Sequence, residues 1–146
     1  MQNLRVHLLA LALLGIPPTL ILIGTFFEVG WIWDLFSNVC HQMPSRSFCP
    51  DDKYMVVCSR CTGIWFSLPL GELFLIKIAP SRRKIFHPII LGLFVLPIAL
   101  DGLLQEMTTY ESTNILRLIT GSLLGGIAGF VLGIIINSLT GKGERR

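Results

Sequence analysis

Four long apolar stretches dominate this sequence and restrict what it can fold into. They run over residues 4–27, 62–79, 88–105 and 115–137. A helix needs about 20 apolar residues to cross a hydrocarbon core of about 30 Å, so each stretch can span a bilayer if it runs nearly upright. Charged residues make up only 14% of the chain, against about a quarter in soluble domains. The sequence predicts an all-α fold, a bundle of four transmembrane helices that forms one integral membrane domain over residues 1–146.

The first apolar stretch has a second interpretation, as a secretory signal peptide. It carries Pro17 and Pro18 in its middle, is longer than a normal signal core, and lacks a small-x-small cleavage site before Glu28. We therefore expect a retained helix.

Basic residues predict the orientation of the four helices. Arg and Lys concentrate in the cytoplasmic loops of membrane proteins. Seven basic residues fall on one side of the predicted bundle and three on the other; the seven are Arg5, Arg82, Arg83, Lys84, Lys142, Arg145 and Arg146, and the three are Arg46, Lys53 and Arg60. Both termini should thus be cytoplasmic in a multi-pass protein of the cell membrane, with the loop over residues 28–61 facing outward. The net charge of +3 is explained by this topology, and we see no signal for nucleic-acid binding.

Glycines recur at every fourth residue in the last apolar stretch, at Gly121, Gly125, Gly129 and Gly133. A row of small residues lets a neighbouring helix approach closely. We expect this edge to pack against another helix, either within the chain or in a second copy or partner subunit.

A polar pocket is predicted between the third and fourth helices. Arg117 continues the glycine row by one step outward, so its side chain should point toward a neighbouring helix, where it needs a carboxylate partner. Asp101 lies at a matching depth, which predicts a direct Asp101–Arg117 ion pair. The pair is either a structural lock or, with Arg60, Gln105 and Asn114, the floor of a pocket beneath the outer loop.

Glu72 falls near the middle of the second apolar stretch with no obvious partner at its depth. An intramembrane carboxylate is either protonated and hydrogen-bonded or part of a proton or ion path. His7 and His87 are expected at the cytoplasmic interface.

All four cysteines lie within residues 40–61, in the most polar part of the chain. Cys58 and Cys61 form a C-x-x-C motif, and Cys40 and His41 lie upstream. Thiolate and imidazole are the ligands of tetrahedral zinc sites. The motif predicts a zinc site made by Cys40, His41, Cys58 and Cys61, with Cys49 as the alternative ligand. Zinc would clamp a loop that is expected to have too little apolar surface to fold by burial.

These residues resemble the signature of a known family. The strings Cys40-His41-Gln42, Arg46-Ser47 and Cys58-x-Arg60-Cys61-Thr62-Gly63 are similar to those of small multi-pass bacterial and archaeal membrane proteins of unknown function, as are Asp101-Gly102 and Asn114-x-x-Arg117-x-x-Thr120-Gly121. The resemblance implies four helices with a Cys/His-rich outer loop, and it implies no activity, substrate or cofactor. It does not include Cys49, which leaves three thiols and one histidine.

Three functional classes follow from the sequence. The first is a metal-binding membrane protein, and the second is a thiol–disulfide redox protein that uses the C-x-x-C motif. The third is a non-catalytic accessory subunit of a membrane complex. Structural disulfides, Cys40–Cys49 with Cys58–Cys61, are the alternative to a metal in an oxidising exterior. The sequence alone does not show whether the protein is an enzyme.

Overall fold

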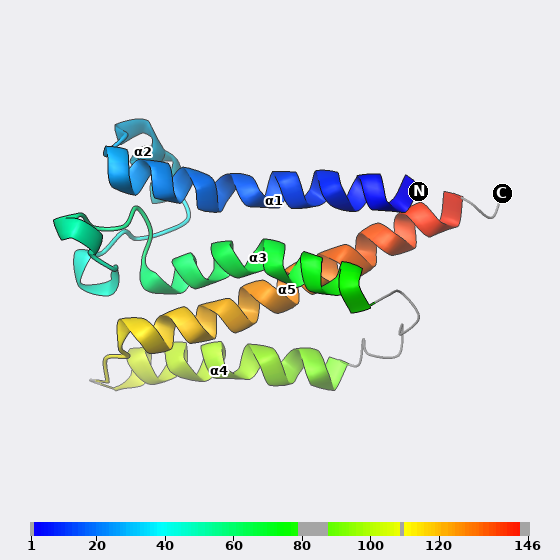
Figure 1. The fold of residues 1–146 in the computed structure, drawn as a ribbon. Helices are drawn as coiled ribbons and strands as arrows, with labels where there is room; N and C mark the ends of the chain where they lie inside the picture. Colours follow the sequence, from blue (N-terminus) through cyan, green and yellow to red (C-terminus); the bar gives the residue numbers. More distant parts are fainter. Residues whose placement is uncertain (1, 79–87, 109, 144–146) are drawn as a thin grey trace.

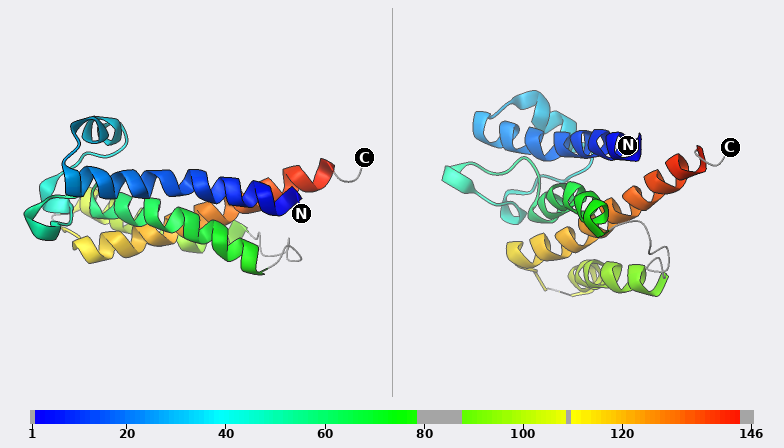
Figure 2. Two further views of the ribbon diagram at one scale, coloured as in Figure 1. Left: turned by 45° about the horizontal axis from the view of Figure 1, so that its top comes forward. Right: turned by 45° about the vertical axis from the view of Figure 1, so that its right-hand side comes forward.

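The computed structural model describes residues 2–78, 88–108 and 110–143. The described residues form an all-helical fold of five α-helices and two short 3₁₀ helices. Four long helices run side by side: α1 (Gln2–Phe27), α3 (Ser59–Ile78), α4 (Pro88–Met107) and α5 (Asn114–Gly143). The short α2 (Gly30–Ser37) and the 3₁₀ helices η1 (Pro44–Arg46) and η2 (Pro50–Asp52) lie together at one end. The start of α1 and the end of α5 lie at the opposite end (Figures 1 and 2).

Two of these helices are long and apolar enough to cross a membrane, over Leu4–Phe27 and Asn114–Leu139. Their apolar side chains mostly point outward, since only 17% and 28% of the residues in these windows are buried. Leu9, Leu13 and Ile119, for example, are more than half exposed. An apolar surface of this kind suits lipid rather than water.

The closest helix packing joins α3 and α5, and the glycine row makes it possible. A Cβ atom added to Gly121, Gly125 or Gly129 would lie 2.2, 2.3 or 2.0 Å from a backbone oxygen of α3. Because no side chain fits at such distances, the two backbones can approach only where glycine stands. The glycine row therefore packs against a helix of the same chain, which is one of the two expected interpretations. Gly121, Gly125 and Gly129 are covered by α3 and are not available to a partner subunit.

The buried apolar core lies at the end of the molecule that holds α2 and the start of α3. It consists of Ile21, Ile32, Phe36, Cys40, Val56 and Val57. The Phe36 ring stands edge-on to Trp65 of α3, with 6.2 Å between ring centroids. The expectation that the loop has too little apolar surface to fold by burial was therefore wrong, because α2 and the residues before α3 supply that surface.

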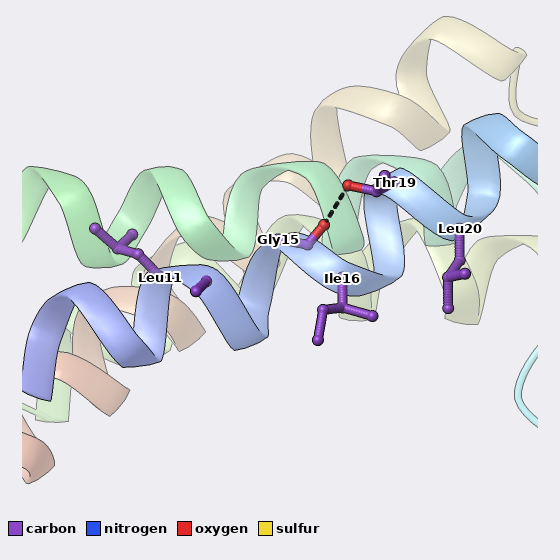
Figure 3. A pocket seen from close by; sticks show the side chains of 6 residues that line it. Leu11, Gly15, Ile16, Thr19 and Leu20 are labelled. Atoms are coloured by element: carbon purple, nitrogen blue, oxygen red, sulfur yellow. Dashed lines mark hydrogen bonds between the residues drawn. The ribbon is translucent and has the colours of Figure 1, made fainter.

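A shallow depression runs along the surface of α1 (Figure 3). Only residues of α1 line it, and all are apolar except Thr19, whose hydroxyl donates a hydrogen bond to the Gly15 carbonyl at 2.7 Å. The lining offers no group for catalysis or metal binding, so this surface is better suited to contact with lipid tails.

Candidate metal centre and polar network

Three cysteines from two parts of the chain meet at the start of α3. Cys40 follows α2, and its backbone N–H still bonds to the Phe36 carbonyl at 2.9 Å. Cys58 directly precedes α3, and Cys61 lies in the first turn of that helix. The three Sγ atoms all lie within 4.8 Å of one another. We call these residues the thiol cluster.

The surroundings of the thiol cluster favour a thiolate. The backbone N–H of Cys58 donates a hydrogen bond to the Sγ atom of Cys40 at 3.2 Å. Hydrogen bonds from the Cys40 thiol and then the Cys61 thiol lower the pKa of Cys58. Cys58 also stands at the N-terminus of α3, where the helix dipole favours negative charge. All four cysteines are free thiols in this structure.

Two of the predicted ligands lie outside the thiol cluster. His41 and Cys49 are exposed, and neither belongs to the group of potential ligand atoms formed by the three cysteines. Neighbouring residues of an extended chain point to opposite sides, so burying Cys40 turns His41 outward. Gln42 then bends the backbone, with a φ angle of 49°, and anchors the bend by donating from Nε2 to the Trp33 carbonyl at 2.8 Å.

A polar network lies next to the thiol cluster and contains four of the five residues predicted for the pocket, Arg60, Asp101, Gln105 and Arg117. Arg60 forms an ion pair with the Oδ2 atom of Asp101. Gln105 donates to the same oxygen at 3.0 Å and to the Ser112 hydroxyl at 2.7 Å. Arg117 donates to the Ser112 hydroxyl at 2.9 Å and to the side-chain Oε1 atom of Gln105 at 3.3 Å. The network thus connects α3, α4 and α5.

The predicted direct pair between Asp101 and Arg117 was wrong. Among the described residues, the cation that contacts Asp101 is Arg60, and Arg117 reaches the carboxylate only through Gln105 and Ser112. Arg117 and Asp101 are both about 95% buried. The prediction named Arg60 for the pocket but not as the partner of Asp101, toward which its side chain extends from the first turn of α3. It did not include Ser112, which precedes α5.

Hydrogen bonds also tie the segment between α2 and α3 to α5 and to the start of α3. Asn114, predicted for the pocket, instead donates to the Ser47 carbonyl at 3.2 Å, and Ser59 donates to the Arg46 carbonyl at 2.9 Å. The network has one donor and one acceptor left over, because the Arg60 Nε and Asp101 Oδ1 atoms are buried and have no hydrogen-bond partner among the described residues.

Glu72 has a partner that the sequence did not suggest. Its Oε1 atom lies 2.5 Å from Nδ1 of His7, near the opposite end of the bundle from the thiol cluster. The expectation of an interfacial His7 missed this contact, since His7 is buried. His87 lies outside the described residues.

Comparison with known proteins identifies similar sequences. Residues 40–138, more than half of the chain, match a family model described as "Predicted membrane protein (DUF2085)". An uncharacterized protein of Methanocaldococcus jannaschii is 37% identical over 97 residues, which cover 64% of this chain and 61% of that protein. An uncharacterized protein of Methanothermobacter thermautotrophicus is 36% identical over 104 residues, which cover 71% of this chain and 92% of that protein. No solved structure matches the chain.

Proposed function

This chain belongs to the DUF2085 family of predicted membrane proteins, and we propose that it is a multi-pass membrane protein whose thiol cluster binds a divalent metal ion. Zinc is the ion that we propose. The observation that carries the proposal is the convergence of three Sγ atoms within 4.8 Å. In a tetrahedral zinc site with bonds of about 2.3 Å, neighbouring sulfurs lie about 3.8 Å apart. The cluster therefore needs only a small contraction to accept the ion.

The chemistry of the thiol cluster also suits zinc. Thiolates are soft ligands that select zinc and Cu(I) over Mg²⁺ and Ca²⁺. Both the N–H bond to Cys40 Sγ and the helix N-terminus at Cys58 compensate for the negative charge of the thiolates. Bound zinc would hold the segment after α2 against the start of α3, which are distant in sequence.

The fourth coordination position decides what the metal does. Four protein ligands make a closed structural site, whereas three leave a position for water or substrate. His41, the expected fourth ligand, is exposed and lies outside the thiol cluster. We therefore propose a three-thiolate site whose fourth position is open to water or an external ligand, where the metal would act as a Lewis acid when bound.

We further propose that all four long helices span the membrane, with both termini in the cytoplasm. The bias of basic residues supports this topology. The position of the thiol cluster at the opposite end from the start of α1 and the end of α5 agrees with it. The metal site would then face the periplasm or the cell exterior.

Thiol–disulfide exchange is the second candidate function. The observation that favours it is the pairing of Cys58 and Cys61 at a helix N-terminus, with hydrogen bonds that lower the pKa of Cys58. In this reaction the two thiols would form one disulfide and pass two electrons and two protons to an oxidised disulfide or a membrane quinone.

Metal analysis of the purified full-length protein, combined with a free-thiol count, tests both functions. We expect one zinc per chain in the wild type, and its loss in Cys40→Ser, Cys58→Ser and Cys61→Ser. The matched control is Cys49→Ser, which should keep its zinc because Cys49 is exposed and apart from the cluster. His41→Ala should also keep it, and loss of zinc there would return His41 to the ligand set and close the site. A Cys58–Cys61 disulfide without metal in the wild type would support the redox function instead.

A further inference from the structure

A second buried polar cluster lies far from the thiol cluster, where α1, α3 and α5 meet. His7 contacts Glu72 through Nδ1 and the side-chain oxygen of Asn137 through Nε2, at 2.5 and 3.0 Å. Glu72 is fully buried, and the residual exposure of His7 is 5%. His7 lies in the second turn of α1, so the cluster is close to the end of the molecule where α1 begins.

The two contacts of His7 determine where its protons can be. The amide oxygen of Asn137 accepts, so Nε2 carries a hydrogen. Nδ1 and the Glu72 carboxylate then share a single proton, either as neutral imidazole with a carboxylic acid or as imidazolium with a carboxylate. Both arrangements have no net charge, which explains how a fully buried glutamate is tolerated among apolar helices.

The second carboxylate oxygen of Glu72, Oε2, takes no part in the contact with His7. Oε2 is buried and has no hydrogen-bond partner among the described residues. A buried polar atom without a partner costs about 1–3 kcal/mol, so its presence calls for an explanation. A proton from water can bind at this atom while the shared proton moves onto His7, which raises the charge of the pair by one.

Among the described side chains, no further charged group contacts this pair. Arg5 on α1 is exposed. On α5, Arg117 belongs to the network at the opposite end, and on α3, Arg60 is paired with Asp101 there. The side chains of Lys77 and Lys142 lie outside the described residues. Among the described side chains, the charged members of this cluster are therefore His7 and Glu72 themselves.

We propose that His7 and Glu72 form a proton-binding site inside the helix bundle, which exchanges a proton with the aqueous phase at the end where α1 begins. This site is independent of the metal site, since it uses different residues at the other end of the molecule. A purely structural hydrogen bond would instead keep its shared proton and would not respond to pH.

Infrared difference spectroscopy of the full-length protein in lipid nanodiscs tests the proposal. The spectra are compared between about pH 5 and 8, the range in which imidazole changes its charge. As the pH falls, the wild type should show growth of a buried-carboxyl C=O band if the pair starts as imidazolium with carboxylate, and growth of imidazolium ring bands if it starts as imidazole with carboxylic acid. The band change should be absent in Glu72→Gln and unaltered in Glu28→Gln, whose carboxylate is 66% exposed.

A third variant keeps the test independent of the folding of Glu72→Gln. In His7→Gln the imidazole that shares the proton with Glu72 is lost, so the pH-dependent change of the wild type should no longer be seen. A wild-type spectrum in which neither the buried-carboxyl band nor the imidazole ring bands change with pH would overturn the proposal, and so would a pH-dependent carboxyl band that persists unchanged in Glu72→Gln.

Discussion

Arg60 and Asp101 form an ion pair that joins the first turn of α3 to α4. Arg60 stands between Cys58 and Cys61, so the same helical turn that carries two thiols of the cluster also carries the cation of the polar network. Any movement of that turn upon metal binding would therefore act on Asp101, and through Gln105 and Ser112 on Arg117.

Removal of one member of this ion pair should destabilise the protein strongly. Asp101 is buried and Arg60 has a 27% exposed side chain, so loss of either leaves a largely desolvated charge. For Asp101→Asn we expect a loss near the lower end of the range of about 3–5 kcal/mol for buried pairs. Thermal unfolding in detergent measures it.

Two control variants accompany that measurement. The double variant Arg60→Gln with Asp101→Asn should recover part of the loss, because no charge is stranded. Lys53→Gln breaks the exposed Lys53–Glu28 pair and should cost less than about 1 kcal/mol. Equal destabilisation by Asp101→Asn and by the double variant would contradict a direct pair.

Alanine at Gly129 should disrupt the packing of α3 on α5. The added Cβ atom would lie 2.0 Å from the Leu68 carbonyl oxygen, which belongs to the backbone and cannot rotate away. We expect a loss of at least about 1–3 kcal/mol, as for other overpacked sites. Gly126→Ala is the matched control, because an added Cβ meets nothing within 4 Å there. Unchanged unfolding of Gly129→Ala would show that the helices are farther apart.

Removal of metal with a chelator should increase the local opening of the segment between α2 and α3 more than that of the helix bundle. The thiol cluster joins Cys40 to the start of α3, whereas α3 and α5 are held by their own glycine contacts. Hydrogen exchange should therefore rise in residues 38–58 and change little in the middle of α5. Equal exchange with and without chelator would argue against a metal in the cluster.

Labelling of Cys49 tests the proposed topology. Its thiol is exposed beside η2, at the same end as the thiol cluster. A membrane-impermeant maleimide should label it from outside intact cells. In a Cys49→Ser background, Lys142→Cys should be labelled only after lysis. The reverse pattern would invert the orientation of the chain.

Much of the architecture could be predicted because it depends on local composition. Apolar stretches of sufficient length indicated the helices, and the all-α fold was confirmed. The four-residue period of Gly121, Gly125 and Gly129 indicated close packing, and α3 does pack there. The predicted burial of Arg117, one step beyond the row, was also confirmed.

The contacts between distant segments could not be predicted in the same way. The position of a residue along its helix indicates its depth in the bundle but not the direction in which its side chain points. Asp101 was therefore paired with Arg117, whereas its partner is Arg60. The contact between His7 and Glu72 could not be predicted for the same reason, because the two residues lie on different helices and are 65 positions apart in the sequence.

The sequence by itself determined the apolar environment, the helical segments and the proximity of Cys58 to Cys61, since one helical turn is enough to bring that pair together. Only the tertiary structure decided that Cys40 rather than His41 turns toward them, that Arg60 holds Asp101, and that His7 covers Glu72. These choices depend on which way each side chain points after helices from distant parts of the chain have packed, and burial and charge pairing act on that packed arrangement rather than on sequence order.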